Sequence, residues 1–332
     1  MSRADINLAA LAQSLRQSRS FAAKADIACV VKALGIETGA IAVGDDCAAI
    51  PDGDGYLLFA IEGFINEFVA SDPWFAGWCG VMVNVSDIAA MGGRPLATVN
   101  AIWSDGQDGA LPILEGLRNA SRAFGVPMVG GHSNLRMKNS QLALAILGRA
   151  KKLLTSFDAT PGDHLVAAID LRGRYREPYP NWDAATSAPP TRLRGDLDLL
   201  PEIAEAGLAR AAKDISQGGI IGTATMLAEC SGVGAVIDID AIPMPADVAI
   251  ERWLQTFPSF GYLLAVGAAE LDEVLARFRA RDIAAAAIGT ITEDPRVRIE
   301  CATQRETVWD LSDRPLIGCA PASATTRDEV RA

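Results

Sequence analysis

The segment at residues 77–95, GWCGVMVNVSDIAAMGGRP, is almost entirely small and apolar, yet Asn84 and Asp87 lie in its middle. Asn84, Asp87 and Met91 are spaced at i, i+3 and i+7, so a helix would carry them on one face. The two glycines and the proline that follow supply a stop, and the spacing therefore predicts a helix from about Val81 to Met91. Because apolar residues cover its other faces, this helix is expected to be buried on several sides.

A buried carboxylate in that helix needs a compensating charge, because an isolated ionised carboxylate in apolar surroundings costs several kcal/mol. The chain has no lysine or arginine between Lys32 and Arg94, and Arg94 lies beyond the predicted helix end. A bound metal ion is therefore one predicted partner of Asp87. The alternatives are that Asp87 caps a backbone turn or pairs with a distant arginine.

Composition limits the class of protein. At 332 residues and 50% hydrophobic, the chain can bury a large core and form two domains. No run of about 18 apolar residues occurs, so we expect a cytoplasmic protein with no membrane span and no secretory signal. The six cysteines form no Cys-x-x-Cys pair, which argues against a zinc site. A net charge of −11 argues against nucleic acid as a partner.

Strands and helices are predicted to alternate in a mixed α/β arrangement. In the first part we expect two opening helices, strands at AIAVG, CAAI and YLLFAI, and a helix over 109–124. In the second part we expect strands at HLVAAID, GAVIDI, GYLLAVG and AAAAIGTI, with helices over 197–211, 219–230 and 269–281. The predicted domains are an N-terminal domain over 1–155, a C-terminal domain over 156–320 and a disordered tail over 321–332.

Carboxylates follow two of the predicted strands. Asp45 and Asp46 come directly after AIAVG, where Gly44 lets the backbone turn, and Glu62 ends YLLFAI. Adjacent carboxylates repel each other unless a cation lies between them. Hard oxygen ligands of this kind suit Mg²⁺, which joins carboxylates to substrate phosphates. An exposed Asp-Asp turn is the alternative.

A glycine pair in MVGGHSN indicates a backbone turn that can approach a ligand closely. Gly130 and Gly131 would form the turn, and His132 and Ser133 would then face phosphate oxygens. A purely structural turn explains this fragment equally well.

A second glycine pair follows Asp214 in KDISQGG. Ser216 is a candidate N-cap, and Gly218 and Gly219 open the predicted helix. Free amides at a helix N-terminus attract anions, so phosphate can bind there while Asp214 holds metal or orients water. Alternatively, Asp214 only favours the helix dipole. No Walker or dinucleotide glycine motif occurs, so any nucleotide site is built differently.

The motifs GDDCAAI, VNVSDIAAMGGRP, GGHS, PGD and DISQGGI occur in an order that resembles the AIR synthase (PurM-like) superfamily over most of residues 40–293. The chain looks most like an AIR-synthase-related branch, related to thiamine-monophosphate kinase, selenophosphate synthetase and a hydrogenase maturation enzyme. The resemblance implies an α/β (α+β) two-domain fold with a C-terminal α/β domain. It also implies a homodimer whose N-terminal sheets form a barrel, and ATP and Mg²⁺ as cofactors.

The resemblance also implies site residues, position by position. The metal ligands would be Asp45, Asp46, Asp87 and Asp214. The nucleotide-binding residues would be Asn84, Ser86, Gly130, Gly131, His132, Ser133, Ser216, Gly218 and Gly219. The catalytic residues stay open, with Asp87, His132 and Asp214 as candidates.

Three features of the sequence depart from the named relatives. His132 and Gln217 stand where the thiamine-phosphate kinase pattern has acids, which puts a full kinase-like set of metal ions in doubt. Cys29 and Lys32 lie inside a predicted helix, which argues against selenide chemistry.

The leading functional hypothesis is an ATP- and Mg²⁺-dependent enzyme that phosphorylates or activates an oxygen of a small metabolite. It would be a ligase or synthetase (cyclo-ligase-like), or a phosphotransferase. The alternatives are a small-molecule kinase resembling thiamine-monophosphate kinase and a nucleotide-binding subunit with little turnover. The arginines of segment 172–194 can hold an anionic substrate group, or the segment is a solvated loop.

Overall fold

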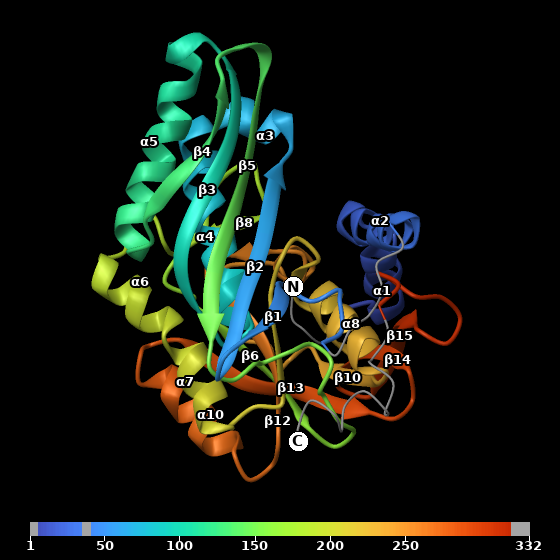
Figure 1. The fold of residues 1–332 in the computed structure, drawn as a ribbon. Coiled ribbons are helices and arrows are strands. Elements are labelled where there is room, and N and C mark those ends of the chain that lie inside the picture. The colour runs from blue at the N-terminus through green and yellow to red at the C-terminus, as the bar shows by residue number, and fades with distance from the viewer. Residues whose placement is uncertain (1–5, 35–40, 320–332) are drawn as a thin grey trace. The chain divides into compact units, whose positions relative to one another are not determined.

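The computed structural model describes residues 6–34 and 41–319 and divides the chain into two compact units. Unit 1 comprises Met1–Asp45, Leu154–Ala184 and Ala206–Ala332, and unit 2 comprises Asp46–Leu153 and Ala185–Glu205. Each unit combines helices with a β-sheet, so the fold is the mixed α+β arrangement that the sequence predicts (Figure 1). The units are discontinuous in sequence, whereas the predicted domains are continuous. The predicted tail over 321–332 lies outside the described residues.

The sheet of unit 2 has five strands, which are antiparallel neighbours except for one parallel pair, β3 with β4. In spatial order they are β1 (Ala48–Asp52), β2 (Gly55–Phe64), β5 (Arg136–Ala150), β3 (Arg94–Asp105) and β4 (Met128–Asn134). The helices that begin in this unit are α3 (Asn66–Ser71), α4 (Pro73–Ala90), α5 (Gly106–Phe124), α6 (Pro190–Leu197) and α7 (Leu199–Ala206).

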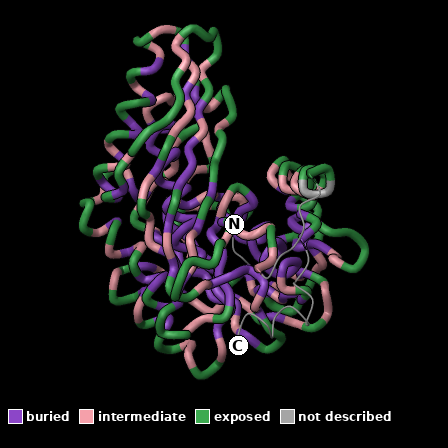
Figure 2. The backbone as a smooth tube through the Cα atoms, in the orientation of Figure 1, coloured by how far each residue is buried: buried purple, intermediate pink, exposed green. Residues whose placement is uncertain are grey.

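The two faces of this sheet differ in burial, because successive side chains of a strand point to opposite faces. Leu58, Leu144 and Ile146 are fully buried on the face that α4 contacts. Phe59 and Ile61 lie on the other face and are 49% and 67% exposed. Figure 2 shows exposed positions interleaved with buried ones along these strands. One face of the sheet therefore carries apolar side chains in solvent.

Helix α4 contains the predicted helix 81–91 and ends as predicted, with Met91 as its C-cap. Its start is earlier than predicted. The Asp72 carboxylate accepts a hydrogen bond from the Phe75 N–H at 3.2 Å, and Pro73 occupies the first turn. A capping aspartate followed by proline is a strong helix start, so the helix begins eight residues sooner than the apolar spacing indicates.

Three other sequence predictions for element bounds are wrong. Residues 41–44 of AIAVG are not in a strand, and the first strand begins at Ala48. Glu62 lies inside β2 rather than at its end. The helix predicted over 197–211 is divided between α6 and α7 and ends at Ala206, because Gly207 takes φ +68°, a left-handed conformation that terminates helices.

Unit 1 contains a seven-stranded sheet in which β10 and β14 form the parallel pair. In spatial order the strands are β15 (Gln304–Asp310), β14 (Arg296–Cys301), β10 (Gly234–Asp238), β13 (Ala284–Thr292), β6 (His164–Ile169), β12 (Gly261–Val266) and β9 (Ala211–Asp214). A small sheet contains β11 (Phe257–Pro258), β8 (Asn181–Asp183) and β7 (Arg174–Tyr175). The helices are α1 (Leu8–Arg16), α2 (Arg19–Leu34), α8 (Gly219–Ser231), α9 (Ile250–Trp253) and α10 (Leu271–Arg279).

The core of unit 1 forms around α8. This helix is buried from Gly219 to Cys230 and contacts β9, β10, β12 and β14. Helix α1 packs on β14 and β15 through Leu8, Leu11 and Leu15, which explains why the N-terminal segment belongs to this unit.

Candidate functional site

The Gly44–Asp45 turn of unit 1 holds a buried carboxylate. Asp45 Oδ2 accepts a hydrogen bond from Ser156 N, and Oδ1 accepts one from Ser156 Oγ, both at 2.6 Å. The Lys213 ammonium lies 3.8 Å from Oδ1, and the two charged side chains are 6% and 1% exposed. Removing one member of such a buried ion pair leaves the other charge uncompensated, at a cost of about 3–5 kcal/mol.

Two thiols lie beside this turn. Gly44 takes φ +117°, and a Cβ atom there would lie 1.9 Å from Cys319 Sγ, so the position requires glycine. A hydrogen bond joins the Cys230 and Cys319 thiols. This bond, together with burial, raises the pKa of Cys230 well above its ordinary value, and the same bond lowers the pKa of Cys319. All six cysteines are free thiols.

The Glu229 carboxylate fixes the segment that carries Cys319. It accepts hydrogen bonds from the backbone N–H groups of Leu316, Ile317 and Gly318 at 2.8, 2.9 and 2.8 Å. Glu229 is 7% exposed, so its charge is stabilised mainly by these three donors. Sequence reasoning missed this residue, because an acid near the end of a predicted helix gives no sign of a partner 87 residues away.

Helix α4 of unit 2 carries the polar residues that the sequence analysis identifies. Asn84, Ser86 and Asp87 are all buried, as predicted for a helix covered on several sides. Asn84 Nδ2 donates to the Gly80 carbonyl at 2.8 Å, and Asn84 Oδ1 has no hydrogen-bond partner among the described residues. A buried amide oxygen without a donor is a group that a ligand or a metal ion can satisfy.

The glycine pair of MVGGHSN does not form the predicted turn. Residues 128–134 are one continuous strand, β4, and Gly130, Gly131, His132 and Ser133 are all exposed. A Cβ atom at Gly131 would lie 2.5 Å from the Asn100 carbonyl oxygen, so glycine serves the close approach of β3 and β4. The His132 ring contacts the Trp103 ring, with 5.9 Å between centroids. The prediction failed because paired glycines fit a tight strand pair as well as a turn.

Helix α8 begins differently from the prediction. Its N-cap is Gly218 rather than Ser216, and no described side chain caps its first turn. Gly219 takes φ +63°, and a Cβ atom there would lie 2.1 Å from the Leu254 carbonyl oxygen. Asp214 ends β9 and is buried, with its side chain on the strand face opposite to that of Lys213. The uncapped start of a buried helix is available for an anion.

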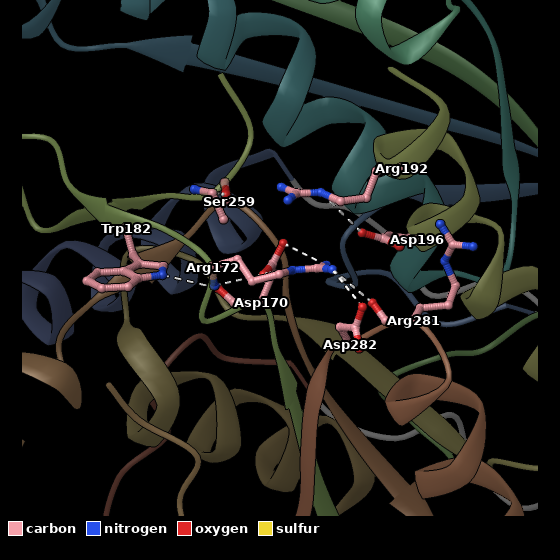
Figure 3. Close-up of polar contacts among 9 residues, drawn as sticks. Asp170, Arg172, Trp182, Arg192, Asp196, Ser259, Arg281 and Asp282 are labelled. Atoms are coloured by element: carbon pink, nitrogen blue, oxygen red, sulfur yellow. Dashed lines mark hydrogen bonds and ion pairs between the residues drawn. The ribbon is translucent and has the colours of Figure 1, made fainter. Parts of the chain in front are cut away.

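The arginines of segment 172–194 have internal partners. Arg172 donates to Asp170 Oδ1 at 2.8 Å and to the Arg281 carbonyl at 3.1 Å, and its side chain extends between Asp170 and Asp282 (Figure 3). Arg194 donates to the carbonyls of Ala123 and Arg122 at the C-terminal end of α5. The segment is therefore not a solvated loop throughout. Arg172 and Arg194 already have partners within the chain.

Unit 2 also has an open hollow of about 360 Å³ at the end of its sheet. Its walls come from the end of β2, the segment that enters α3, and neighbouring parts of β3 and β5. They are formed by Gly63, Phe64, Ile65, Asn66, Trp103, Gln141, Leu142 and Ala143. No residue of the predicted site lies in this lining.

Two family models match the chain. Residues 44–150 match "AIR synthase related protein, N-terminal domain", and residues 182–302 match "AIR synthase related protein, C-terminal domain". The chain belongs to the AIR synthase related family. The two matched ranges contain every residue of the predicted metal and nucleotide sets.

Relatives and solved structures agree with the family. An uncharacterised protein from Synechocystis sp. is 50% identical over 84% of this chain and 87% of its own length. Thiamine-monophosphate kinase from Pyrococcus horikoshii is 30% identical over 62% of this chain and 69% of its own length. The structure of Thermotoga maritima PurL complexed with ATP aligns with a TM-score of 0.70 and 21% identity, over 83% of this chain and 47% of that one. The fold is that of the PurM-like superfamily.

The predicted metal ligands of this AIR synthase related chain are distributed over both units. Asp45 and Asp214 belong to unit 1, and Asp46 and Asp87 belong to unit 2. Within the described part of the chain, no three His, Cys, Asp or Glu side chains gather as a metal-binding group. Mg²⁺ usually takes one or two carboxylates together with water and substrate phosphates, so it does not require a preformed cage of three acids. Asp45 fits it poorly, because a lysine and a serine already hold both of its oxygens.

Among the helices that the structure describes, none is both long enough and apolar enough to cross a membrane.

Proposed function

We propose that this chain is an ATP- and Mg²⁺-dependent enzyme that phosphorylates or activates an oxygen of a small metabolite. The observation that carries the proposal is the polar face of α4, where Asn84 and Asp87 are buried in a helix that is otherwise apolar. The Asp87 carboxylate is a hard oxygen ligand of the type that Mg²⁺ prefers, and so is the Asn84 amide oxygen, which accepts from no described donor.

In this proposal the residues act mainly through charge and position. Asp46 and Asp87 in unit 2, and separately Asp214 in unit 1, are each candidate ligands of Mg²⁺, which would supply charge neutralisation at the phosphates. The Gly218 N–H would bind a phosphate oxygen at the start of α8, whereas the Gly219 N–H already donates to the Ser216 carbonyl oxygen at 2.9 Å. Phosphoryl transfer requires little covalent participation by the protein, so such a set suffices without a protein nucleophile. His132, exposed on β4, remains a candidate for contact with phosphate or substrate.

The relatives support the proposal that this chain binds a nucleotide, and they leave the type of reaction open. Thiamine-monophosphate kinase is by its name a phosphotransferase, and a solved PurL structure of the same fold contains ATP. The chain spans about half of that PurL chain, so the activity of the whole PurL protein is not transferred to it.

A small-molecule kinase is the second candidate, favoured by the 30% identity to thiamine-monophosphate kinase. A kinase yields a stable phosphorylated product, whereas a ligase-type reaction yields ADP, phosphate and a condensed product. Analysis of both products across a panel of small metabolites separates the two reactions. ATP binding without ADP formation across the panel would favour a nucleotide-binding subunit.

Mg²⁺ and ATP together are expected to raise the melting temperature more than either one alone, because the carboxylates should bind the joint complex. A ligand at 100 times its dissociation constant stabilises the native state by about 2.7 kcal/mol. Differential scanning calorimetry with Mg²⁺, ATP or both measures the effect. Isothermal titration that detects no nucleotide binding in the presence of Mg²⁺ would refute the proposed function.

We also propose that the chain forms a homodimer through the open face of the unit 2 sheet. The exposed apolar residues of this face are Ile50, Phe59, Ile61, Val99 and Leu147, which share one side of the paired strands. A contiguous apolar surface of this kind is typical of a protein–protein interface. A second copy of the chain presents the same surface, so a two-fold contact would cover both.

Light scattering is expected to give twice the chain mass of 35.0 kDa for the natural protein. The double variant Phe59→Lys, Ile61→Lys is expected to give the single chain mass, because two buried ammonium groups would oppose the interface. Leu111→Lys changes an exposed leucine on α5 and serves as the control that should stay dimeric. A natural protein that is monomeric at micromolar concentration would contradict the proposal.

A further inference from the structure

Lys213 is a buried cation that the sequence analysis does not use. It lies in β9 after Ala211 and Ala212 and one position before Asp214, and only 4% of the residue is exposed. Because strand side chains alternate, Lys213 and Asp214 point to opposite faces of β9. An ammonium group in these surroundings needs a counter-charge, and the nearby Asp45 carboxylate supplies one, 3.8 Å away.

Both oxygens of Asp45 are already engaged. Oδ2 accepts from Ser156 N, and Oδ1 accepts from Ser156 Oγ while also facing Lys213 Nζ. A metal ion bound to either oxygen would share that oxygen with a short hydrogen bond and lie close to the ammonium group, whose charge repels it. Ser156 and Lys213, which hold Asp45, come from two distant parts of the sequence but belong to the same unit.

The surroundings of the turn also restrict its movement. Cys319 fills the space where a Gly44 side chain would lie, and three hydrogen bonds to Glu229 hold the segment just before Cys319. The Gly44–Asp45 turn is thus enclosed by the C-terminal segment as well as by Ser156 and Lys213. A carboxylate in so fixed a position cannot easily change partners.

We infer that Asp45 is the structural counter-ion of Lys213 and not a magnesium ligand, so the acid pair of GDDCAAI divides its roles between its two members. Asp45 fixes the turn, so any metal ligation by this acid pair would come from Asp46. The statement that Asp45 is not a magnesium ligand matters only if the chain binds Mg²⁺ with ATP, so this part of the inference rests on the proposed function.

A double-mutant cycle tests the ion pair without any ligand. Asp45→Asn and Lys213→Met are each expected to lower the melting temperature by at least about 5 °C. The double variant should lose no more than the larger single loss, because residues in contact are not additive. Lys213→Arg keeps the charge and should recover most of the loss. Additive losses, or no loss in Lys213→Met, would overturn the ion-pair role.

The part of the inference that concerns magnesium is tested by titrating Mg²⁺ in the presence of a non-hydrolysable ATP analogue, below the melting temperature of each variant. Asp45→Asn should change the Mg²⁺ affinity less than about 3-fold, whereas Asp46→Asn should weaken it at least about 10-fold. An Asp45→Asn loss as large as that of Asp46→Asn would overturn the inference. If a single variant does not fold, Ser156→Ala replaces it in both measurements, with a smaller loss of stability and unchanged metal affinity expected.

Failure of the proposed function and failure of the ion-pair inference give different results. If the natural protein binds no nucleotide with Mg²⁺, the proposed function is refuted, and the part of the inference that concerns magnesium no longer applies. The unfolding cycle would still decide whether Lys213 and Asp45 depend on each other.

Discussion

Glu229→Ala is expected to lower the free energy of unfolding by about 3–5 kcal/mol, because three backbone N–H groups lose their acceptor. Leu316 and Ile317 are buried, so their amides cannot turn to water instead, while Gly318 is exposed. A buried donor left unsatisfied costs about 1–3 kcal/mol. The loss is a large part of the total stability of a typical domain, which is about 5–15 kcal/mol. Urea unfolding followed by circular dichroism measures it.

Two further variants make this test specific. Glu229→Gln keeps the size of the side chain and one acceptor oxygen, which can still accept from the Leu316 and Ile317 N–H groups, so it should be destabilised less than Glu229→Ala. Glu273→Ala removes an acid whose ion pair with Arg277 is exposed on α10, and such pairs contribute about 0.3–0.5 kcal/mol. If Glu229→Ala unfolds at the same urea concentration as Glu273→Ala, the Glu229 carboxylate does not hold the C-terminal segment.

Asp87→Asn is expected to weaken Mg²⁺-dependent ATP binding by at least about 10–100-fold while leaving the fold intact. The change keeps the size of a side chain buried in α4 and removes its negative charge. Loss of a group that supports a metal site typically reduces metal affinity by about 10–100-fold, and loss of a direct carboxylate ligand should cost no less. Isothermal titration of an ATP analogue with and without Mg²⁺ gives the affinity.

Asp108→Asn is the matched control, because it makes the same chemical change at an exposed position of α5, in the same unit. It should bind Mg²⁺ and nucleotide as the natural protein does. Normal binding by Asp87→Asn, with an unchanged melting temperature, would show that Asp87 has no part in nucleotide binding. A large loss of stability in Asp87→Asn without ligand would instead assign the residue to the packing of α4.

The sequence predicts α4 well because its signals are local. Apolar residues at helical spacing and a Gly-Gly-x-Pro stop specify a buried helix, and the structure confirms both its burial and its end. The need for glycine at some of its positions is explained only by how the helix packs. A Cβ atom at Gly77 would lie 2.1 Å from the Ile113 carbonyl oxygen, and one at Gly116 would lie 1.9 Å from that of Trp74. The close crossing of α4 and α5 is therefore a tertiary requirement that no single-helix pattern predicts.

The segment MVGGHSN is a case in which a prediction from the local sequence failed. The glycine pair is compatible with a turn and with an edge strand, and the choice depends on whether another backbone approaches. Strand β3 does approach, within contact distance of Gly131, so the segment extends as β4. Residues 41–44 of AIAVG, although apolar and partly β-branched, are likewise not in a strand.

By itself the sequence determined the α+β class, most of the helices and strands, and the family, while the acids and glycines that could bind Mg²⁺ and ATP stay predictions. These follow from patterns of period 2 and 3.6 and from motifs read within about 20 residues. Only the tertiary structure decided which charges meet. Lys213 and Asp45 are 168 positions apart, and Glu229 and Gly318 are 89 apart, yet each pair is in contact. A charge in a chain does not reveal its partner until folding removes water from both, and burial then makes the pairing obligatory.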